Sequence, residues 1–159
     1  MGEIRNGAAA ELWQTLIREA CESGDTPLDE ARESYLVFVL LRHQRDERLL
    51  ARIQALEWLD AQQRAGSVRA DALRDVGDRC LLVAGLFPAL ARRRRVSVDY
   101  FVDLGRSAYQ GVAETGRDAY AELFARLADS YRDLVSVLRG VRGGPAAARV
   151  LSPAAALLH

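Results

Sequence analysis

The side chains best suited to chemistry in this sequence are acids, arginines and tyrosines that gather between positions 75 and 109. Such groups can bind a polar ligand, or they can lock two helices together through ion pairs and hydrogen bonds. We favour the structural clamp, because ion-pair networks inside a fold imitate binding sites. The candidate residues for either role are Asp75, Asp78, Arg79, Asp99, Tyr100, Asp103, Arg106 and Tyr109.

Asp78 is the most informative member of this set. On a helix its face continues as Leu81 and Leu82, so its carboxylate should lie at the edge of a buried surface. A buried carboxylate needs a partner that compensates for the loss of water. We expect that partner to be Arg106, a tyrosine hydroxyl, or the free backbone amides of a helix that starts at Ser97.

The sequence lacks residues and motifs that many kinds of catalysis require. All 22 basic residues are arginine, which removes a Schiff-base lysine and the lysine of a phosphate-binding loop. The glycine-rich nucleotide loops and the GxSxG motif of serine hydrolases are also missing. We therefore expect no cofactor and lean against an enzyme. An enzyme that uses Asp78, Asp99 and Tyr100 is the weakest alternative.

Metal binding has no recognisable signature in the sequence. The two histidines are His43 and His159, and Cys21 and Cys80 stand far apart, so no zinc-ligand spacing occurs. We interpret His43 as a solvated side chain in a polar turn. A magnesium or calcium site made of carboxylates alone stays open, but we assign no residue to a metal.

Charge and hydropathy limit the partners. The formal net charge is zero, which removes a general attraction to nucleic acid. Arg92–Arg95 is the one concentrated basic run, and we interpret it as a solvated helix end that suits the helix dipole. The longest uncharged run in the body of the chain, Cys80–Ala91, is shorter than the ~20 residues that span a bilayer. Without an apolar signal sequence at the N-terminus, we expect a cytoplasmic protein with no membrane span and no nucleic-acid partner.

The spacing of hydrophobic residues predicts the elements that hold these candidates, a single all-α domain of about six helices. The body covers residues 8–142, after a flexible N-terminus at residues 1–7. An Ala- and Leu-rich tail follows at residues 143–159 and is either disordered or docked. A first helix spans residues 8–22 and a third spans about residues 47–64. The predicted helix caps are Thr26, Asp46, Ser67, Ser97 and Thr115.

Two apolar helices should form the centre of the domain. Tyr35–Leu41 consists of apolar residues only, which predicts a helix surrounded by other helices. The helix that follows Ser67 should be buried in a similar way until Pro88 kinks or ends it. Gly105 costs ~1 kcal/mol relative to alanine inside a helix. We therefore expect it to admit a close neighbour, either the helix that carries Gly85 or the Tyr35–Leu41 helix.

The last predicted helix carries the longest regular pattern. Its apolar residues alternate at spacings of four and three, which is the a/d seam of a helical bundle or coiled coil. The seam residues are Tyr120, Phe124, Leu127, Tyr131, Leu134, Leu138 and Val141. Such a seam packs inside one chain or joins two copies, and we favour packing inside the chain.

Short motifs of small and aromatic residues occur along the middle of the chain. They are Gly77-Asp78, Gly85-Leu86-Phe87, Val96-Ser97-Val98-Asp99-Tyr100, Gly105 and Ala108-Tyr109. Together they resemble an uncharacterised family of all-helical bacterial proteins, over roughly the region from Tyr35 to Tyr109. The resemblance implies an all-helical fold and a bacterial source, and it implies no reaction.

These observations favour a non-enzymatic protein that acts through a protein–protein surface as an interaction or adaptor module. The partner could be a second copy of the chain, bound through the last helix. The support is the long seam, the apolar tail and the missing catalytic apparatus. The alternative is a helical bundle that binds a small molecule between the helices that follow Ser67 and Ser97.

Overall fold

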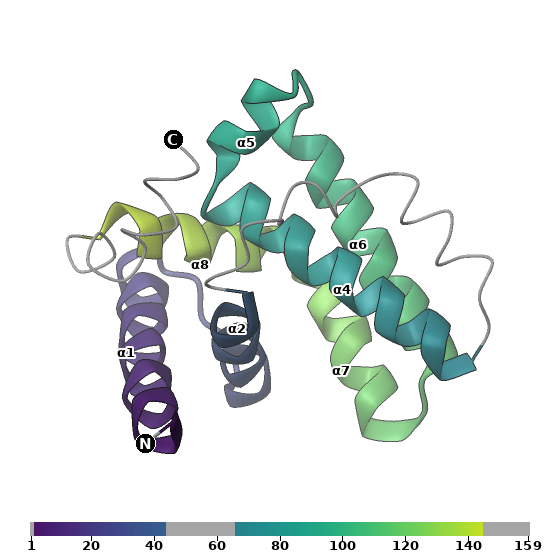
Figure 1. Ribbon diagram of the computed structural model, residues 1–159, viewed down its shortest axis with the longest axis horizontal. Helices are drawn as coiled ribbons and strands as arrows, with labels where there is room; N and C mark the ends of the chain where they lie inside the picture. The colour runs from purple at the N-terminus through teal and green to yellow at the C-terminus, as the bar shows by residue number, and fades with distance from the viewer. Residues whose placement is uncertain (1, 44–65, 145–159) are drawn as a thin grey trace.

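The computed structural model describes residues 2–43 and 66–144 of the chain, and these ranges form one domain (Figure 1). Within them lie seven helices and no strand, which confirms the predicted all-α fold. The helices are α1 (Gly2–Ser23), α2 (Glu30–His43), α4 (Gly66–Gly85), α5 (Pro88–Arg93), α6 (Val98–Thr115), α7 (Asp118–Asp129) and α8 (Tyr131–Gly143). The helix predicted near residues 47–64, its cap Asp46, and the tail beyond residue 144 lie outside the described residues. None of the described helices is long and apolar enough to cross a membrane.

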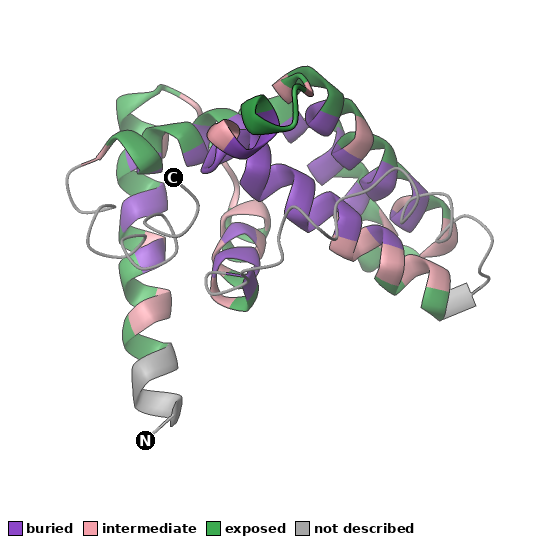
Figure 2. Ribbon diagram, turned by 45° about the horizontal axis from the view of Figure 1, so that its top comes forward, coloured by how far each residue is buried: buried purple, intermediate pink, exposed green. Residues whose placement is uncertain are grey.

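Helix α4 is the centre of the domain. Every residue from Val76 to Phe87 is buried, and Figure 2 shows this continuous buried segment. The helix packs along α6 and also against α8, and it meets α2 over a short length. The predicted burial of this part of the chain is confirmed. A helix that is apolar on all sides needs neighbours on all sides, and α4 has them.

Helix α2 is less central than its sequence predicts. Leu36, Val39 and Leu40 are buried, but the Phe38 side chain is 44% exposed. The prediction that other helices surround the whole Tyr35–Leu41 segment is therefore wrong. The reason is that α2 packs chiefly against α1 and meets α4 and α7 only briefly, so part of its circumference has no neighbour among the described helices.

The end of α4 and the starts of α5 and α6 lie where local signals predict, whereas α4 begins at Gly66 and so includes the predicted cap Ser67. α4 ends at Gly85, and Pro88, which has no backbone N–H to donate, becomes the first residue of α5. The Arg92–Arg95 run closes this segment and is exposed. Ser97 caps α6, where its hydroxyl accepts a hydrogen bond from the backbone N–H of Tyr100 at 3.1 Å.

Two predicted helix starts are wrong. The cap of α2 is Asp29 rather than Thr26, because the Asp29 carboxylate accepts a hydrogen bond from the backbone N–H of Arg32 at 3.0 Å. α2 therefore begins later than predicted. The Thr115 hydroxyl donates to backbone carbonyls of the preceding turns of α6 instead of capping α7. A threonine within hydrogen-bond reach of such carbonyls can take this local alternative.

The predicted last helix is two helices, α7 and α8, which meet at Ser130. Ser130 has φ −102° and ψ 19°, outside the helical range. Its hydroxyl donates to the carbonyl of Arg126 at 2.7 Å, a local bond that competes with the helical ladder. The seam still packs inside the chain, as we favoured, because every seam residue except Tyr120 is buried.

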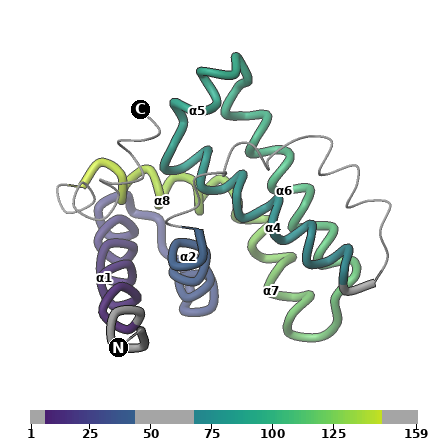
Figure 3. The backbone as a smooth tube through the Cα atoms, in the orientation of Figure 1, coloured from purple at the N-terminus to yellow at the C-terminus, as the bar shows by residue number. Residues whose placement is uncertain are grey.

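Helices α1 and α2 form a pair at one side of the domain (Figure 3). The first predicted helix is confirmed, although it begins at Gly2. Trp13 and Ile17 of α1 are fully buried, and α1 also packs against α8. This arrangement holds α2 so that its final turn comes beside the middle of α4, where Asp78 lies.

Candidate functional site

The Asp78 carboxylate joins three helices. Asp78 is fully buried on α4. Its Oδ1 atom accepts a hydrogen bond from the hydroxyl of Tyr109 on α6 at 2.6 Å, and another from the hydroxyl of Tyr35 on α2 at 2.5 Å. The expectation that a tyrosine hydroxyl serves Asp78 is confirmed. A second tyrosine, from α2, binds the same oxygen, and the sequence did not predict this contact.

Both tyrosines are held as hydrogen-bond donors. Burial raises the pKa of Tyr35 and of Tyr109 well above its ordinary value, and the nearby Asp78 carboxylate raises both pKa values further. Burial likewise raises the pKa of Tyr131, with Cys80 and Asp78 as smaller causes. These phenols therefore keep their protons near neutral pH. Each can donate to a carboxylate but cannot act there as a base.

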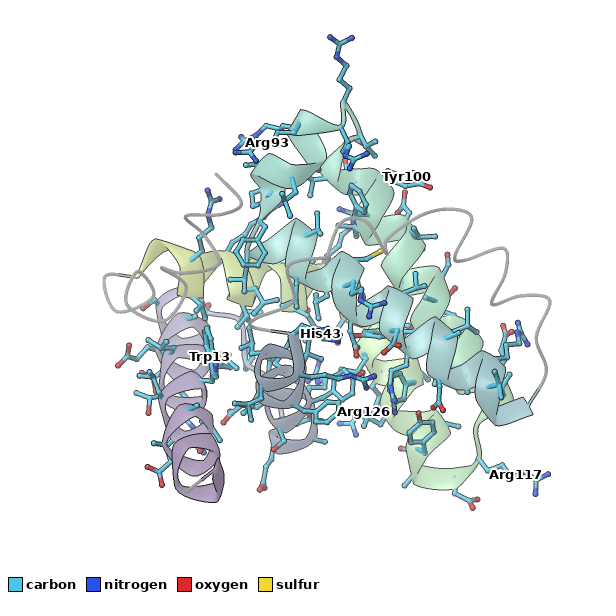
Figure 4. The ribbon with its side chains drawn as sticks, in the orientation of Figure 1. Trp13, His43, Arg93, Tyr100, Arg117 and Arg126 are labelled. Atoms are coloured by element: carbon cyan, nitrogen blue, oxygen red, sulfur yellow. The ribbon has the colours of Figure 1, made fainter. Side chains whose placement is uncertain are left out.

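The second oxygen of Asp78 faces the end of α2. Asp78 Oδ2 lies 3.9 Å from Nε2 of His43, and it accepts no hydrogen bond from the described residues. His43 is buried, and Figure 4 shows it between α2 and α4. The interpretation of His43 as a solvated side chain in a polar turn is wrong. α2 continues through His43, which is placed on the same inward face as Leu36 and Val39 at helical spacing.

Asp75 adds a second carboxylate beside this pair. It lies one turn before Asp78 on α4, and its Oδ1 atom is 2.9 Å from Nη2 of Arg42, the residue before His43. Neighbouring residues at the end of α2 therefore face acids one turn apart on α4. One potential ligand atom from each of His43, Asp75 and Asp78 lies within 4.8 Å of the other two. We call Tyr35, His43, Asp75, Asp78 and Tyr109 the Asp78 cluster.

Aromatic rings form one wall of the Asp78 cluster. The ring of Tyr109 makes edge contacts with the rings of Phe124 and Tyr131, each at a centroid distance of 5.4 Å. The Tyr131 hydroxyl donates to the backbone carbonyl of Gly77 at 2.8 Å, beside Asp78. A methyl group on Gly77 would overlap the Tyr109 ring. The glycine at this position therefore lets the phenol approach α4 closely enough to reach Asp78.

Gly105 lies where other helices approach α6 closely, as expected for a glycine that destabilises the interior of a helix. A methyl group there would overlap the Tyr131 hydroxyl of α8 and would crowd Cβ of Cys80 on α4. The expected approach of α4 is confirmed, but it occurs at Cys80. Gly85 instead faces Leu138 of α8.

The structure does not bring all eight candidate residues together. Asp78 and Tyr109 are in contact, and Asp75 and the buried Arg79 lie on the same helix as Asp78. Four candidates on α6 are exposed instead, because they occupy positions away from its buried face; they are Asp99, Tyr100, Asp103 and Arg106. Figure 4 shows Tyr100 toward the α5 end of α6.

Two of these exposed acids have a separate partner. Arg132 of α8 lies 3.4 Å from Asp99 and 3.9 Å from Asp103, and all three side chains are well exposed. Exposed ion pairs of this kind contribute little to stability. The expected lock between α4 and α6 therefore depends on Asp78 and Tyr109, and Asp99 has no part in it.

The residues that the sequence analysis missed are Tyr35, Arg42 and His43 of α2. One signal could have found His43, since it follows Leu36 and Val39 at spacings of seven and four residues on the buried face. Nothing in the sequence pairs α2 with Asp78, because that contact joins residues 43 positions apart.

No family model, no curated protein and no solved structure matches this chain. Of the resemblance described above, only the all-helical character is confirmed. The Asp78 cluster and the surface around it are therefore the features that bear on the function of this chain.

Proposed function

We propose that this chain is a non-enzymatic binding protein whose ligand site is the Asp78 cluster, between the end of α2 and the middle of α4. The supporting observation is that the two oxygens of the fully buried Asp78 carboxylate differ in the hydrogen bonds that they accept. Oδ1 accepts two phenol hydrogen bonds, whereas Oδ2 accepts none from the described residues. A buried carboxylate is costly unless both its charge and its lone pairs are compensated.

The hydrogen bonds to Oδ1 are sufficient for a structural clamp. They already join α2, α4 and α6, whereas the expected clamp joined α4 and α6 alone. The phenols are neutral, however, because their pKa values are raised, so they supply hydrogen bonds and no positive charge. Arg74 interacts electrostatically with Asp78, but no described residue donates a hydrogen bond to Oδ2. A cationic or hydrogen-bonding ligand at Oδ2 would take that position. The clamp and the site are thus two uses of one side chain.

The Asp78 cluster is close enough to solvent for a ligand to enter. The side chain of Arg42 is 35% exposed and that of Asp75 is 26% exposed, although Asp78 behind them is fully buried. α2 meets α4 over only a short length, and we expect a ligand to enter between them, past the partly exposed Arg42 and Asp75. This places the proposed site between α4 and α2, rather than between the two helices that the sequence analysis chose.

The test is native mass spectrometry of the full chain, purified without denaturation, compared with its denatured mass. We expect the folded wild-type protein to carry an added mass that denaturation releases. Asp78→Asn, which keeps the shape of the side chain, should remove that mass. The matched control is Asp103→Asn, an exposed acid on α6, which should retain it. Equal folded and denatured masses for the wild-type protein would contradict the proposal.

A second candidate function, binding of a protein partner, is supported by a row of aromatic rings whose two end members are exposed. Phe38, Tyr35, Phe124 and Tyr120 follow one another at centroid distances of 6.0, 5.2 and 4.9 Å. The end residues Phe38 and Tyr120 are 44% and 41% exposed. Aromatic residues are enriched in protein interfaces. A homodimer would use this row, because the seam of α7 and α8 is buried.

Light scattering tests the homodimer. At high micromolar concentration the wild-type chain should have the mass of two copies, and Phe38→Ser should have the mass of one. A wild-type monomer removes this candidate. We also propose a cytoplasmic location, which Cys21 and Cys80 support because neither forms a disulfide.

A further inference from the structure

We infer that the ligand of the Asp78 cluster is a divalent transition-metal ion, bound by the imidazole of His43 and by one carboxylate oxygen each of Asp75 and Asp78. The inference rests on the proposed function and names the chemical class of the ligand. It uses one imidazole nitrogen and two carboxylate oxygens, all within 4.8 Å of one another.

These separations are close to those of a formed metal site. Zinc binds imidazole nitrogen and carboxylate oxygen at about 2.0–2.2 Å, so two ligand atoms of a tetrahedral site stand about 3.3–3.6 Å apart. The 3.9 Å between Nε2 of His43 and Oδ2 of Asp78 is wider than this by about half an ångström or less. A pair at the 4.8 Å limit of the cluster must close by about 1.2–1.5 Å, which side-chain rotation can provide.

The Asp78 carboxylate is oriented as metal ligands are. In metal sites the ligating carboxylates are themselves hydrogen-bonded by outer residues, which fix their direction. Tyr35 and Tyr109 both donate to Oδ1 and so turn Oδ2 toward His43. Oδ2 accepts no hydrogen bond from the described residues, and the Asp78 side chain is fully buried. This is a second observation that points to a ligand, independent of the clustering of acids.

The donor set selects the class of metal. One imidazole with two carboxylates suits zinc, manganese, iron or cobalt, whereas magnesium and calcium prefer oxygen ligands throughout. Three protein ligands also leave at least one coordination position for water or a small molecule. The site therefore resembles an open metal centre more than a closed structural one.

Arg42 is a competitor for this metal. Its guanidinium lies 2.9 Å from Oδ1 of Asp75, and its side chain is partly exposed. A bound cation would share Asp75 with Arg42 or displace it toward solvent, and the two positive charges repel each other. Removing the guanidinium should therefore tighten metal binding. A purely structural role of Asp75 and Asp78 gives no such expectation.

The test is isothermal titration of the full-length protein, freed of metal with EDTA, using zinc chloride. We expect one zinc ion per chain for the wild type. His43→Gln and Asp78→Asn should each weaken binding by about tenfold to a hundredfold or more, and Arg42→Gln should strengthen it. Asp71→Asn, an exposed acid one turn before Asp75 on α4, is the control and should bind as the wild type does. Magnesium chloride should give no binding.

Circular dichroism of each variant shows whether it is folded. If Asp78→Asn unfolds, the zinc affinity of His43→Gln still tests the inference. Cobalt chloride provides a spectroscopic check, because its visible absorption should appear with the wild type and not with His43→Gln. Equal zinc affinity of the wild type and His43→Gln would overturn the inference, as would no binding of zinc, manganese or cobalt.

Failure of the metal inference and failure of the proposed function are distinguishable. If no metal binds but native mass spectrometry finds an organic mass that Asp78→Asn removes, the metal inference fails and the proposed binding site stands. If the wild type and Asp78→Asn behave alike in both experiments, both proposals fail.

Discussion

Replacement of Asp78 by asparagine should destabilise the metal-free protein by about 1–3 kcal/mol. Hydrogen bonds to a charged group are worth about 1.5–3 kcal/mol each, against about 0.5–1.5 kcal/mol for neutral ones. Asp78→Asn converts two such bonds, at 2.5 and 2.6 Å, from the first kind to the second. Removing the buried charge returns part of the loss, because asparagine costs less to desolvate.

The assay is urea unfolding at pH 7, followed by circular dichroism. The midpoint should fall with little change in the slope, because the surface exposed on unfolding stays the same. Asp103→Asn, at an exposed position, should change stability by no more than about 0.5 kcal/mol. A double-mutant cycle with Tyr109→Phe should give a coupling energy of about 1 kcal/mol or more. A coupling near zero, or an Asp78→Asn protein as stable as the wild type, would refute the reasoning.

Three further predictions concern the residues around the cluster. The folded-state pKa values of Tyr35, Tyr109 and Tyr131 are raised, so the folded protein holds these protons more tightly than the unfolded chain. This stabilisation is complete below the unfolded value near pH ~10 and is lost as the pH rises above it, by up to about 1.4 kcal/mol per pH unit for each tyrosine. Urea unfolding should therefore show a lower free energy of unfolding at pH 11 than at pH 9. Tyr131→Phe should make this difference smaller. Equal stability of the wild-type protein at the two pH values would contradict the prediction. Gly77→Ala should cost about 1–3 kcal/mol by overpacking against the Tyr109 ring, and a thermal melt equal to wild type would contradict that contact. Ser97→Ala should cost about 1 kcal/mol through loss of the α6 cap, whereas Ser97→Asp should restore the stability in the same melt.

The sequence predicted the elements whose signals are local. Pro88 and Ser97 each act on the turn that they occupy, and the C-terminal end of α4 and the start of α6 follow from them. Where two local signals for a helix boundary lie close together, the sequence alone did not show which of them operates. Asp29 caps α2 in place of Thr26, and Ser130 interrupts a seam whose spacing alone predicts one helix.

The burial of α2 could not be predicted from its composition. An apolar run shows how much surface a helix could bury, but the amount that it does bury depends on where its neighbours end. α2 meets α4 and α7 only briefly, so Phe38 is left exposed in a segment that is uniformly apolar. The opposite holds for α4, whose polar Asp78 is fully buried because neighbouring helices supply donors.

About half of the candidate site could be predicted from the sequence. The position of Asp78 at the edge of an apolar face implies a buried carboxylate, and a tyrosine hydroxyl was among the expected partners. The contributions of Tyr35 and His43 depend on the packing of α2 against α4, which no spacing within either segment encodes. Asp99 and Asp103 were proposed as part of a polar cluster on two neighbouring helices, yet the outward face of α6 carries them to solvent.

A crystal structure of the full chain grown with zinc chloride, recorded at the zinc absorption edge, tests the central claim most directly. The account predicts an anomalous peak between His43, Asp75 and Asp78, about 2.0–2.2 Å from each ligand atom, with both phenols still bound to Oδ1 of Asp78. No peak at this position, or an Asp78 side chain turned away from His43 with its Oδ2 occupied by another protein donor, would contradict it.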